Sequence, residues 1–489
     1  MNTLKRYQIW IALAVLILPV LARGLWFYQG IPSRPEIQAP DYAAASLPQP
    51  PLSTPVPETA AAPSGQVVVV DYSHSNQFDP SEIQSLVSFL TWRGARVEFD
   101  NGYPYLSTRL KYASAYIVIS PGYSFTAEEV TLVGQFIQRG GRLVVFTDPT
   151  HGIIDYESFT GNPVMLSDVS AANSLLAPFD IAFENDYLYN LVNNEGNFRN
   201  VLFARFSDND LTKGLSQVAF YGVHSVSAQS GQPFISGDKN TLSSRTDSSE
   251  NAATIPGEGL AAAALNADGN VLAIGDFTFL LPPYNQVADN NLLLGRIADF
   301  ALGGTRTHAL ADFPYLFGRQ AHLLVVGDLQ LTADLLAPLA YLQKVIRMSD
   351  TSLSIAPEAV AGSDTIVIGL LTPSEDLDRF IEPLKLGLDD PASVTVPGFG
   401  QIGRTGVGLM LFKPGLNGNT PTGHNTLILL TDSPEDLPML INLLANGDMS
   451  SCVIQNNIGV CSIGYSGSSF GTPIPSEEIQ PAETPTPAG

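Results

Sequence analysis

Cysteine is scarce in this chain, where only Cys452 and Cys461 occur among 489 residues. A cysteine nucleophile is therefore excluded everywhere before Cys452, and the lack of cysteine near the N-terminus excludes a lipoprotein anchor. Histidine is also sparse, and the spacing of the six residues is not that of zinc ligands; they stand at positions 74, 151, 224, 308, 322 and 424. We expect neither a metal nor a cofactor.

Basic residues are few, since 24 Lys and Arg stand against 47 Asp and Glu and the formal net charge is −23. A surface of this sign repels phosphate backbones and anionic lipid headgroups, and no stripe of Lys or Arg interrupts it. We therefore expect no nucleic acid partner. A cation, a basic protein or a neutral glycan is compatible with the charge.

Apolar residues are concentrated near the N-terminus. Lys5 and Arg6 precede a mostly apolar segment, Tyr7 to Tyr28, about as long as the roughly 20 residues that a bilayer core requires. Early basic residues favour a cytoplasmic N-terminus and place the rest of the chain outside. We interpret residues 1–30 as a single-pass anchor in the cell membrane; a cleaved signal segment, which would give a secreted protein, is the alternative.

Two proline-rich segments flank the part of the chain that we expect to fold. Residues 31–66 alternate proline with Ala, Ser and Thr, a composition typical of an extended, semi-stiff linker. Residues 466–489 repeat this composition and are predicted to be a disordered tail. The chain length, with 45% hydrophobic residues, allows two or three domains between these segments.

Residues 67–304 alternate short β-prone runs with amphipathic segments. Val67 to Asp71 has the continuous apolar pattern of a strand buried on both faces, and Ile83 to Leu90 places its apolar residues on one helical face. Thr126 is placed to cap another helix, which Gly140 ends. Further strand patterns lie at 97–99, 116–119, 143–146 and 271–274. The alternation predicts an α/β domain with a doubly wound, mostly parallel sheet of the flavodoxin-like type.

In such sheets, ligands bind beyond the carboxyl ends of the strands. Loops 71–76, 120–124 and 147–151 are predicted to meet there, together with the acid after the strand at 271–274. The candidate ligand-binding side chains are Asp71, Ser73, His74, Asn76, Tyr123, Asp148 and Asp276. Acids that follow strands also cap turns and helices, so a purely structural role is the alternative.

Residues 305–465 predict a second, smaller α/β domain. Strand patterns at 322–327, 365–370, 406–412 and 426–430 alternate with helical patterns at 331–345, 374–388 and 434–445. The domain ends in a predicted hairpin, across which Cys452 and Cys461 are candidates for a disulfide; two buried free thiols are the alternative. This order and the turn at 431–434 loosely resemble carbohydrate-binding and flavodoxin-like modules of bacterial cellulose-synthase accessory subunits.

Several motifs of the first domain resemble an uncharacterised domain-of-unknown-function family. They are Asp71 to Asn76, Arg93-Gly94, Ser120-Pro121-Gly122, Gly140 to Leu143 and Gly275 to Leu280. That family is similar to class I glutamine-amidotransferase-like folds and to ectodomains of gliding-motility-type ABC-transporter accessory proteins. Relatives are similar to proteins encoded near MoxR-type AAA ATPases and von Willebrand A-type proteins. The resemblance therefore implies a role in the bacterial envelope, with a transporter or such a system as partner.

The chain departs from true amidotransferases at the nucleophile. Those enzymes carry a cysteine on the turn after a strand, where this chain has Ser120-Pro121-Gly122. Asp71, Ser73 and His74 are residue types that a serine hydrolase uses, but no Gly-x-Ser-x-Gly elbow accompanies them. The oxygen-rich stretch 186–195 lacks the spacing of an EF-hand calcium loop.

These observations favour a non-catalytic, membrane-anchored ectodomain that binds an envelope protein or a glycan during transport or assembly. A hydrolase acting in the crevice at the strand ends is the first alternative. A purely structural spacer is the second.

Overall fold

The structure is a computed structural model that describes most of the chain between residues 2 and 463. The described ranges are 2–28, 65–156, 161, 163–245, 255–256, 258–318, 320–417, 420–421, 424–455 and 457–463. Apart from residues 65 and 66, the expected linker at 31–66 lies outside the described residues, and so does the expected tail at 466–489.

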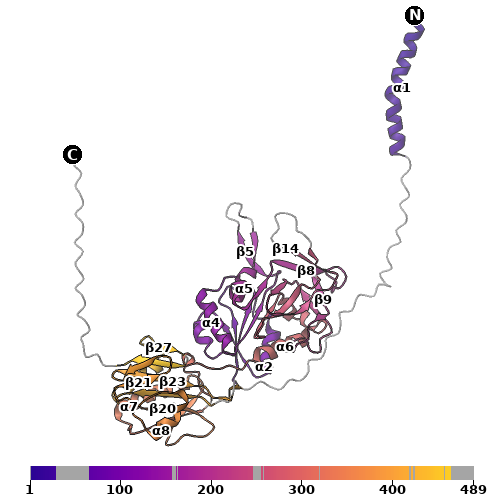
Figure 1. Ribbon diagram of the computed structural model, residues 1–489. Helices are drawn as coiled ribbons and strands as arrows, with labels where there is room; N and C mark the ends of the chain where they lie inside the picture. Colours follow the sequence, from indigo (N-terminus) through magenta and orange to yellow (C-terminus); the bar gives the residue numbers. More distant parts are fainter. Residues whose placement is uncertain are drawn as a thin grey trace, which may run out of the picture. The chain divides into compact units, whose positions relative to one another are not determined.

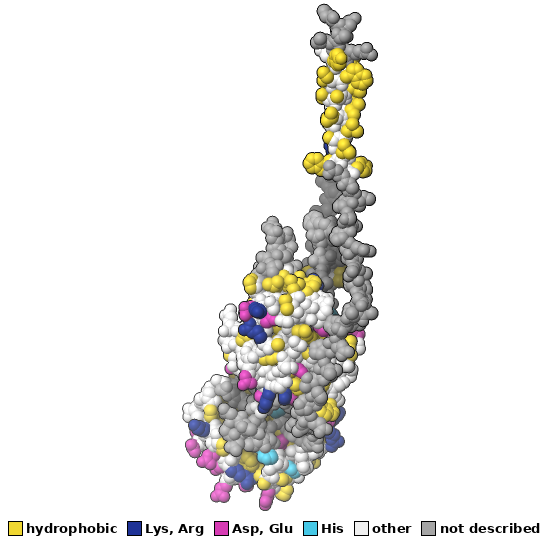
Figure 2. All heavy atoms as spheres, turned by 90° about the vertical axis from the view of Figure 1, so that its right-hand side faces the viewer, with side chains coloured by type: hydrophobic (Ala, Val, Ile, Leu, Met, Phe, Trp, Pro, Cys, Tyr) yellow, Lys and Arg dark blue, Asp and Glu magenta, His cyan; other side chains and the backbone are white. Residues whose placement is uncertain are grey.

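The N-terminal helix α1 (Asn2–Phe27) is the feature on which membrane attachment depends. Its 21-residue segment Tyr7–Phe27 is, among the described residues, the one helix long and apolar enough to cross a bilayer. Figure 2 shows hydrophobic side chains covering the described part of this helix. A signal sequence would meet the same criteria.

A ten-stranded sheet forms the centre of the first folded region. Five of its strands are parallel and lie in the order β2-β1-β3-β4-β17. Their bounds are β1 Val67–Asp71, β2 Arg96–Asp100, β3 Ala115–Ile119, β4 Arg142–Phe146 and β17 Val271–Ile274. β1 and β3 are buried along their whole length, as their β-branched and apolar sequences predict.

Helices cover both faces of these parallel strands (Figure 1). Alternate residues divide between the faces: Val68 and Val70 pack in the core with α2 (Gln84–Trp92) and α6 (Asn290–Leu302). Val67 and Val69 pack in a separate core with α4 and α5. The latter helices are α4 (Ala127–Gln138) and α5 (Val169–Leu176), and one turn of helix, α3, spans Leu106–Arg109.

Helix α4 shows why the local sequence folds as predicted. The Thr126 hydroxyl accepts a hydrogen bond from the Glu129 amide, and the Glu129 carboxylate accepts from the Thr126 amide at 2.8 Å. This reciprocal pairing satisfies two amides that the first turn of a helix leaves open. The helix ends before Gly140, whose φ of +88° is a backbone conformation that favours glycine.

Antiparallel strands extend the first sheet beyond β17, and others form two smaller sheets. Strands form within the polar stretches 185–200 and 225–257, because polar side chains there are buried against hydrogen-bonding partners. In β8, for example, Asp186, Leu188 and Asn190 point inward. In the first sheet these strands are β7 Ile181–Phe183, β10 Arg205–Phe206, β12 Val226–Ala228, β13 Gln232–Ser236 and β16 Ala261–Leu265. A separate three-stranded sheet contains β8 Asp186–Asn190, β14 Thr241–Arg245 and β15 Ile255–Pro256, and β9 Asn200–Phe203 pairs with β11 Val218–Tyr221.

A hairpin of β5 (Gly152–Tyr156) and β6 (Pro163–Ser167) follows β4 and forms a sheet of its own. Ile154 and Tyr156 on β5 are 65% and 64% exposed. The hairpin projects from the first region (Figure 1). Its two exposed apolar side chains therefore lie outside the core of the first sheet.

A seven-stranded sheet organises the second folded region, with the order β19-β18-β20-β26-β23-β28-β27. The first four strands are parallel, and the last three are antiparallel to their neighbours. Their bounds are β18 Gln320–Val325, β19 Ser352–Ala356, β20 Asp364–Leu370, β23 Val407–Lys413, β26 Thr426–Thr431, β27 Cys452–Gln455 and β28 Ile458–Ser462; two small pairs are β21 Ser393–Val396 with β22 Gly400–Gly403, and β24 Leu416–Asn417 with β25 Thr420–Pro421. The expectation of a mixed α/β chain with a mostly parallel central sheet and a second sheet-rich region is confirmed.

Helices again pack on both faces of the second sheet. α7 (Ala333–Arg347) and α9 (Leu437–Asn446) share one core, and α8 (Glu375–Ile381) packs in the other. The helix expected over 374–388 is shorter than predicted. It ends at Ile381 because Pro383 has no amide hydrogen to continue the helical hydrogen bonds. A 3₁₀ turn then leads to Lys385, whose φ is +56°.

Cys452 and Cys461 lie opposite each other on β27 and β28, and a disulfide joins them. The Cys461 side chain is fully buried against the core that α7 and α9 share. The bond therefore ties the outermost strand β27 to the rest of the second sheet.

We expect the double substitution Cys452→Ser, Cys461→Ser to lower the free energy of unfolding of the second region. Opening so short a loop removes about 2–3 kcal/mol, because the unfolded chain regains conformational freedom. Urea unfolding followed by circular dichroism measures the change, and reductant should destabilise the native chain but not the variant. Equal stability of the two proteins under oxidising conditions would contradict this.

Candidate functional site

The carboxyl ends of β1, β3, β4 and β17 lie at one edge of the first sheet, since these strands are parallel neighbours. The polar residues at these ends are Asp71, Ser120, Asp148 and Asp276, and all four are fully buried. A buried carboxylate requires hydrogen-bond donors or a compensating charge. The partners of these acids therefore decide what the site can do.

Asp71 is surrounded by donors from its own loop. Its Oδ1 accepts a hydrogen bond from the Ser73 hydroxyl at 2.9 Å, and its Oδ2 accepts from Asn76 Nδ2 at 3.0 Å. His74 Nδ1 lies 3.0 Å from both carboxylate oxygens. Asn76 also donates to the Ile119 carbonyl at 2.9 Å, which joins this loop to the end of β3.

His74 connects this loop to helix α4. Its ring stacks on Phe125 with 3.8 Å between the ring centroids, and its Nε2 lies 3.5 Å from Glu129 Oε1. Burial lowers the pKa of His74, but the contacts with Asp71 and Glu129 outweigh burial and raise it above its ordinary value. Burial raises the pKa of Glu129, but the hydrogen bonds from Thr126 and the contact with His74 outweigh burial and hold this pKa below its usual range.

Ser73, His74 and Asp71 meet, but not in the geometry of a hydrolytic triad. In a triad one imidazole nitrogen faces the acid and the other faces the serine. Here His74 Nδ1 faces both Asp71 and Ser73, the latter at 3.2 Å, and Nε2 faces Glu129. The Ser73 hydroxyl also donates to Asp71. The arrangement therefore lacks the order of acid, imidazole and serine that a triad requires.

Asp148 and Asp276 form a neighbouring network around Thr278. The Thr278 hydroxyl donates to Asp148 Oδ2 at 2.7 Å, and its amide donates to Asp276 Oδ1, also at 2.7 Å. The Tyr221 amide donates to Asp276 Oδ2 at 2.7 Å. Burial and the charge of Asp148 raise the pKa of Asp276 well above its usual value. His151 Nδ1 lies 3.5 Å from Asp148 Oδ2 and helps to lower the Asp148 pKa against the effect of burial.

The buried side chains of Asp168 and His224 extend this network. The sequence predicts neither residue as part of the site. Asp168 Oδ2 accepts a hydrogen bond from the Asp148 amide at 3.0 Å, and its Oδ1 lies 3.5 Å from His224 Nε2. His224 Nδ1 lies 2.6 Å from the Asp186 carbonyl oxygen. Gly275 makes this packing possible, because a Cβ there would overlap the carbonyl oxygen of His224. In the sequence, this glycine after β17 is the feature that comes nearest to indicating the contact between Asp168 and His224.

The predicted site residues thus fall into two adjoining networks. Asp71, Ser73, His74 and Asn76 form the first, and Asp148 and Asp276 form the second. The turn after β3 contacts the first network, since the Gly122 and Tyr123 amides both donate to the His74 carbonyl. The Tyr123 side chain is 64% exposed, so it lies at the surface of this edge.

The oxygen-rich stretch 186–195 does not gather its side chains around one point. The Asp186 carboxylate accepts from Ser225 and Ser243, whereas Asn190 donates to Asp238 at 2.8 Å. These side chains hold β8 against β14 and the segment before β12. Their hydrogen bonds account for the polar residues of this stretch.

Comparison with known proteins assigns no family to the chain. No family model matches it, and no curated protein matches it. Solved structures similar to part of it include the N-terminal domain of mmIFT52, at 13% identity and a TM-score of 0.38, covering 50% of this chain and 100% of that one. A ThuA-like protein from Bacteroides uniformis is 12% identical, with a TM-score of 0.31 and coverage of 51% and 94%. A ThuA-like protein from Parabacteroides merdae is 12% identical, with a TM-score of 0.25 and coverage of 49% and 90%.

We expect Asp71→Ala to destabilise the first region by about 3 kcal/mol, because the buried side chains of His74 and Asn76 lose the carboxylate that they share. Urea unfolding monitored through Trp92 fluorescence measures the change. Asp79→Ala is the matched control, since Asp79 accepts hydrogen bonds only within an exposed turn with Ser81, and it should change little. Equal unfolding midpoints for the two variants would contradict a stabilising role for Asp71.

The imidazole of His74 predicts a pH dependence of stability. A pKa raised above the unfolded value of 6.5 contributes stability that is complete below pH 6.5 and is lost as pH rises through the folded pKa. The urea midpoint of the first region should therefore fall between about pH 6 and pH 8. His151 and His224, whose pKa values are also raised above the same ordinary value, add to this fall.

His74→Gln isolates the contribution of His74. The variant should lose less stability than the native chain over the same pH interval, because it retains only the contributions of the other groups. Unfolding midpoints of both proteins at matched ionic strength test this. Parallel declines would show that the Asp71 and Glu129 contacts do not set the charge of His74.

Proposed function

We propose that the chain is a membrane-anchored ectodomain without catalytic activity, which binds a partner protein or a glycan during envelope transport or assembly. Helix α1 is the anchor, with Lys5 and Arg6 on the cytoplasmic side and the two sheet regions outside the cell membrane. The disulfide between Cys452 and Cys461 supports an oxidising compartment.

The proposal that the site is not catalytic rests on one observation: the carboxylates at the strand ends already accept hydrogen bonds from the protein. A catalytic acid or base must reach a substrate proton within hydrogen-bond distance. Asp71, Asp148 and Asp276 are fully buried, and their oxygens accept from residues of the protein itself. These contacts are those of carboxylates that close turns and join strands.

The turn after β3 supports the proposal of an amidotransferase-like, doubly wound fold. It also supports the proposal that this fold no longer carries a nucleophile at that turn. Ser120 has a φ of +39°, the strained conformation that a nucleophile elbow imposes. Its side chain is fully buried, so substrate has no access to the hydroxyl. A transporter or a MoxR and von Willebrand A-type system is the partner class that we propose for such an ectodomain.

A photo-crosslinking residue in place of Tyr123 tests the proposed binding in cells. Tyr123 is 64% exposed at the carboxyl edge of the first sheet, and Trp92 is a matched control, 55% exposed at the end of α2. We expect a discrete crosslinked product in the membrane fraction from position 123 and not from position 92. Absence of a product from position 123 would favour a structural spacer.

A further inference from the structure

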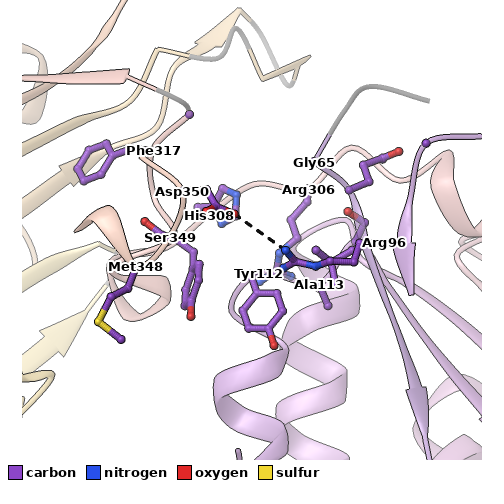
Figure 3. Close-up of a pocket in the computed structure, with 16 residues that line it drawn as sticks. Gly65, Arg96, Tyr112, Ala113, Arg306, His308, Phe317, Met348, Ser349 and Asp350 are labelled. Atoms are coloured by element: carbon purple, nitrogen blue, oxygen red, sulfur yellow. Dashed lines mark ion pairs between the residues drawn. The ribbon is translucent and has the colours of Figure 1, made fainter. Parts of the chain in front are cut away.

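A crevice of about 840 Å³ lies where the two sheet regions meet. Arg96 and Tyr112 line it from the first region, and Phe317 and Asp350 line it from the second. Arg306 and His308 come from the segment that connects the two regions (Figure 3). Its lining includes two guanidinium groups and one imidazole, against one carboxylate, that of Asp350.

Asp312 is the buried acid beneath this crevice, and several cations share it. It is 2% exposed, and its Oδ1 lies 3.1 Å from Arg139 Nη2 and 3.4 Å from Arg306 Nη2. His308 Nδ1 lies 3.7 Å from the other oxygen. The charge of Asp312 also acts on Lys111, whose Nζ donates a hydrogen bond to the Phe313 carbonyl at 3.4 Å. One carboxylate therefore serves more than one buried positive charge.

Arg306 retains unsatisfied donors. Its side chain is 8% exposed, and its Nη2 donates to the Leu110 carbonyl at 2.8 Å. Its guanidinium also lies 4.7 Å from the centre of the Phe136 ring. Nε and Nη1 have no hydrogen-bond partner within the described structure. Unsatisfied buried donors are costly and rare, so each requires an explanation.

The balance of charge agrees with these open donors. Burial lowers the pKa of Arg306 to about 10. The charge of Asp312 raises this pKa only in part, and the charge of Arg139 lowers it further. Burial also lowers the pKa of Lys111 despite Asp312. Additional negative charge at this position would favour the protonated forms of both side chains.

Arg96 at the mouth of the crevice is available to a ligand. Its Nε lies 2.9 Å from Glu98 Oε1, but its Nη1 is 4.0 Å from Asp350 Oδ2. The Asp350 side chain is 92% exposed, so this contact is screened by solvent. An anion can replace it at little cost.

We propose that this crevice binds a small ligand bearing a phosphate or carboxylate group, whose oxygens accept hydrogen bonds from Arg306 and Arg96. A guanidinium presents donors in a planar fork that matches both kinds of oxyanion. The site is distinct from the edge that carries Asp71 and Asp148. It is also independent of the partner binding proposed above.

Isothermal titration of the full chain in detergent with sodium pyrophosphate and with sodium citrate tests the proposal. We expect saturable binding of at least one of them, above the effect of sodium chloride at equal ionic strength. Binding of pyrophosphate alone identifies a phosphate ligand, binding of citrate alone a carboxylate ligand, and binding of both a site that recognises charge. No saturable binding of either up to millimolar concentration overturns the proposal.

Substitutions place the binding in the crevice. Arg96→Gln should weaken binding about tenfold, the effect of losing one charge-assisted hydrogen bond. Arg205→Gln is the matched control, because Arg205 is similarly exposed and paired, with Glu258 at 3.2 Å, on the distant strand β10. Arg306→Gln should abolish binding while circular dichroism remains native; if that variant does not fold, the Arg96 and Arg205 pair decides. Equal affinity of the Arg96 and Arg205 variants overturns the proposal.

Discussion

Burial of carboxylates at the ends of parallel strands is the constraint on which the first region depends. The strands β1, β3, β4 and β17 bury their apolar residues on both faces, so the chain must turn sharply at the edge where helices and loops return. Acids at these turns accept hydrogen bonds from backbone amides that no strand satisfies. Asp148 and Asp276 show this most clearly, since both accept from Thr278.

The parallel strands and their helices were predictable because their signals are local. Val67 to Asp71 is apolar without interruption, and Thr126 with Glu129 is a capping pair within one turn. The antiparallel strands were not predictable, because β8 and β14 bury Asp186 and Ser243 as a hydrogen-bonded pair. A polar side chain buried by a partner 57 positions away resembles a loop residue in the sequence.

The candidate site was predictable only in outline, for a similar reason. The loop of Asp71 and His74 closes within five residues, so its members stand together in the sequence. Asp148 and Thr278 are 130 positions apart, and Asp168 meets His224 only because β17 brings Gly275 beneath it. These contacts depend on how the strands are ordered in the sheet and not on a local motif. The division of the acids into two networks could therefore not be predicted from the sequence.

The buried charges of the chain form two groups that differ in how completely they are compensated. At the strand ends, Asp71, Asp148 and Asp276 accept hydrogen bonds from the protein itself, and a ligand of these acids would have to break hydrogen bonds that stabilise the fold. Around Arg306 the balance is reversed, because cations outnumber carboxylates and two donor atoms have no acceptor. Positive charge left uncompensated inside a chain of net charge −23 cannot be attributed to a shortage of acids. The position of the uncompensated charge therefore favours the crevice between the sheet regions, rather than the strand ends, as the place where the protein meets a small anion.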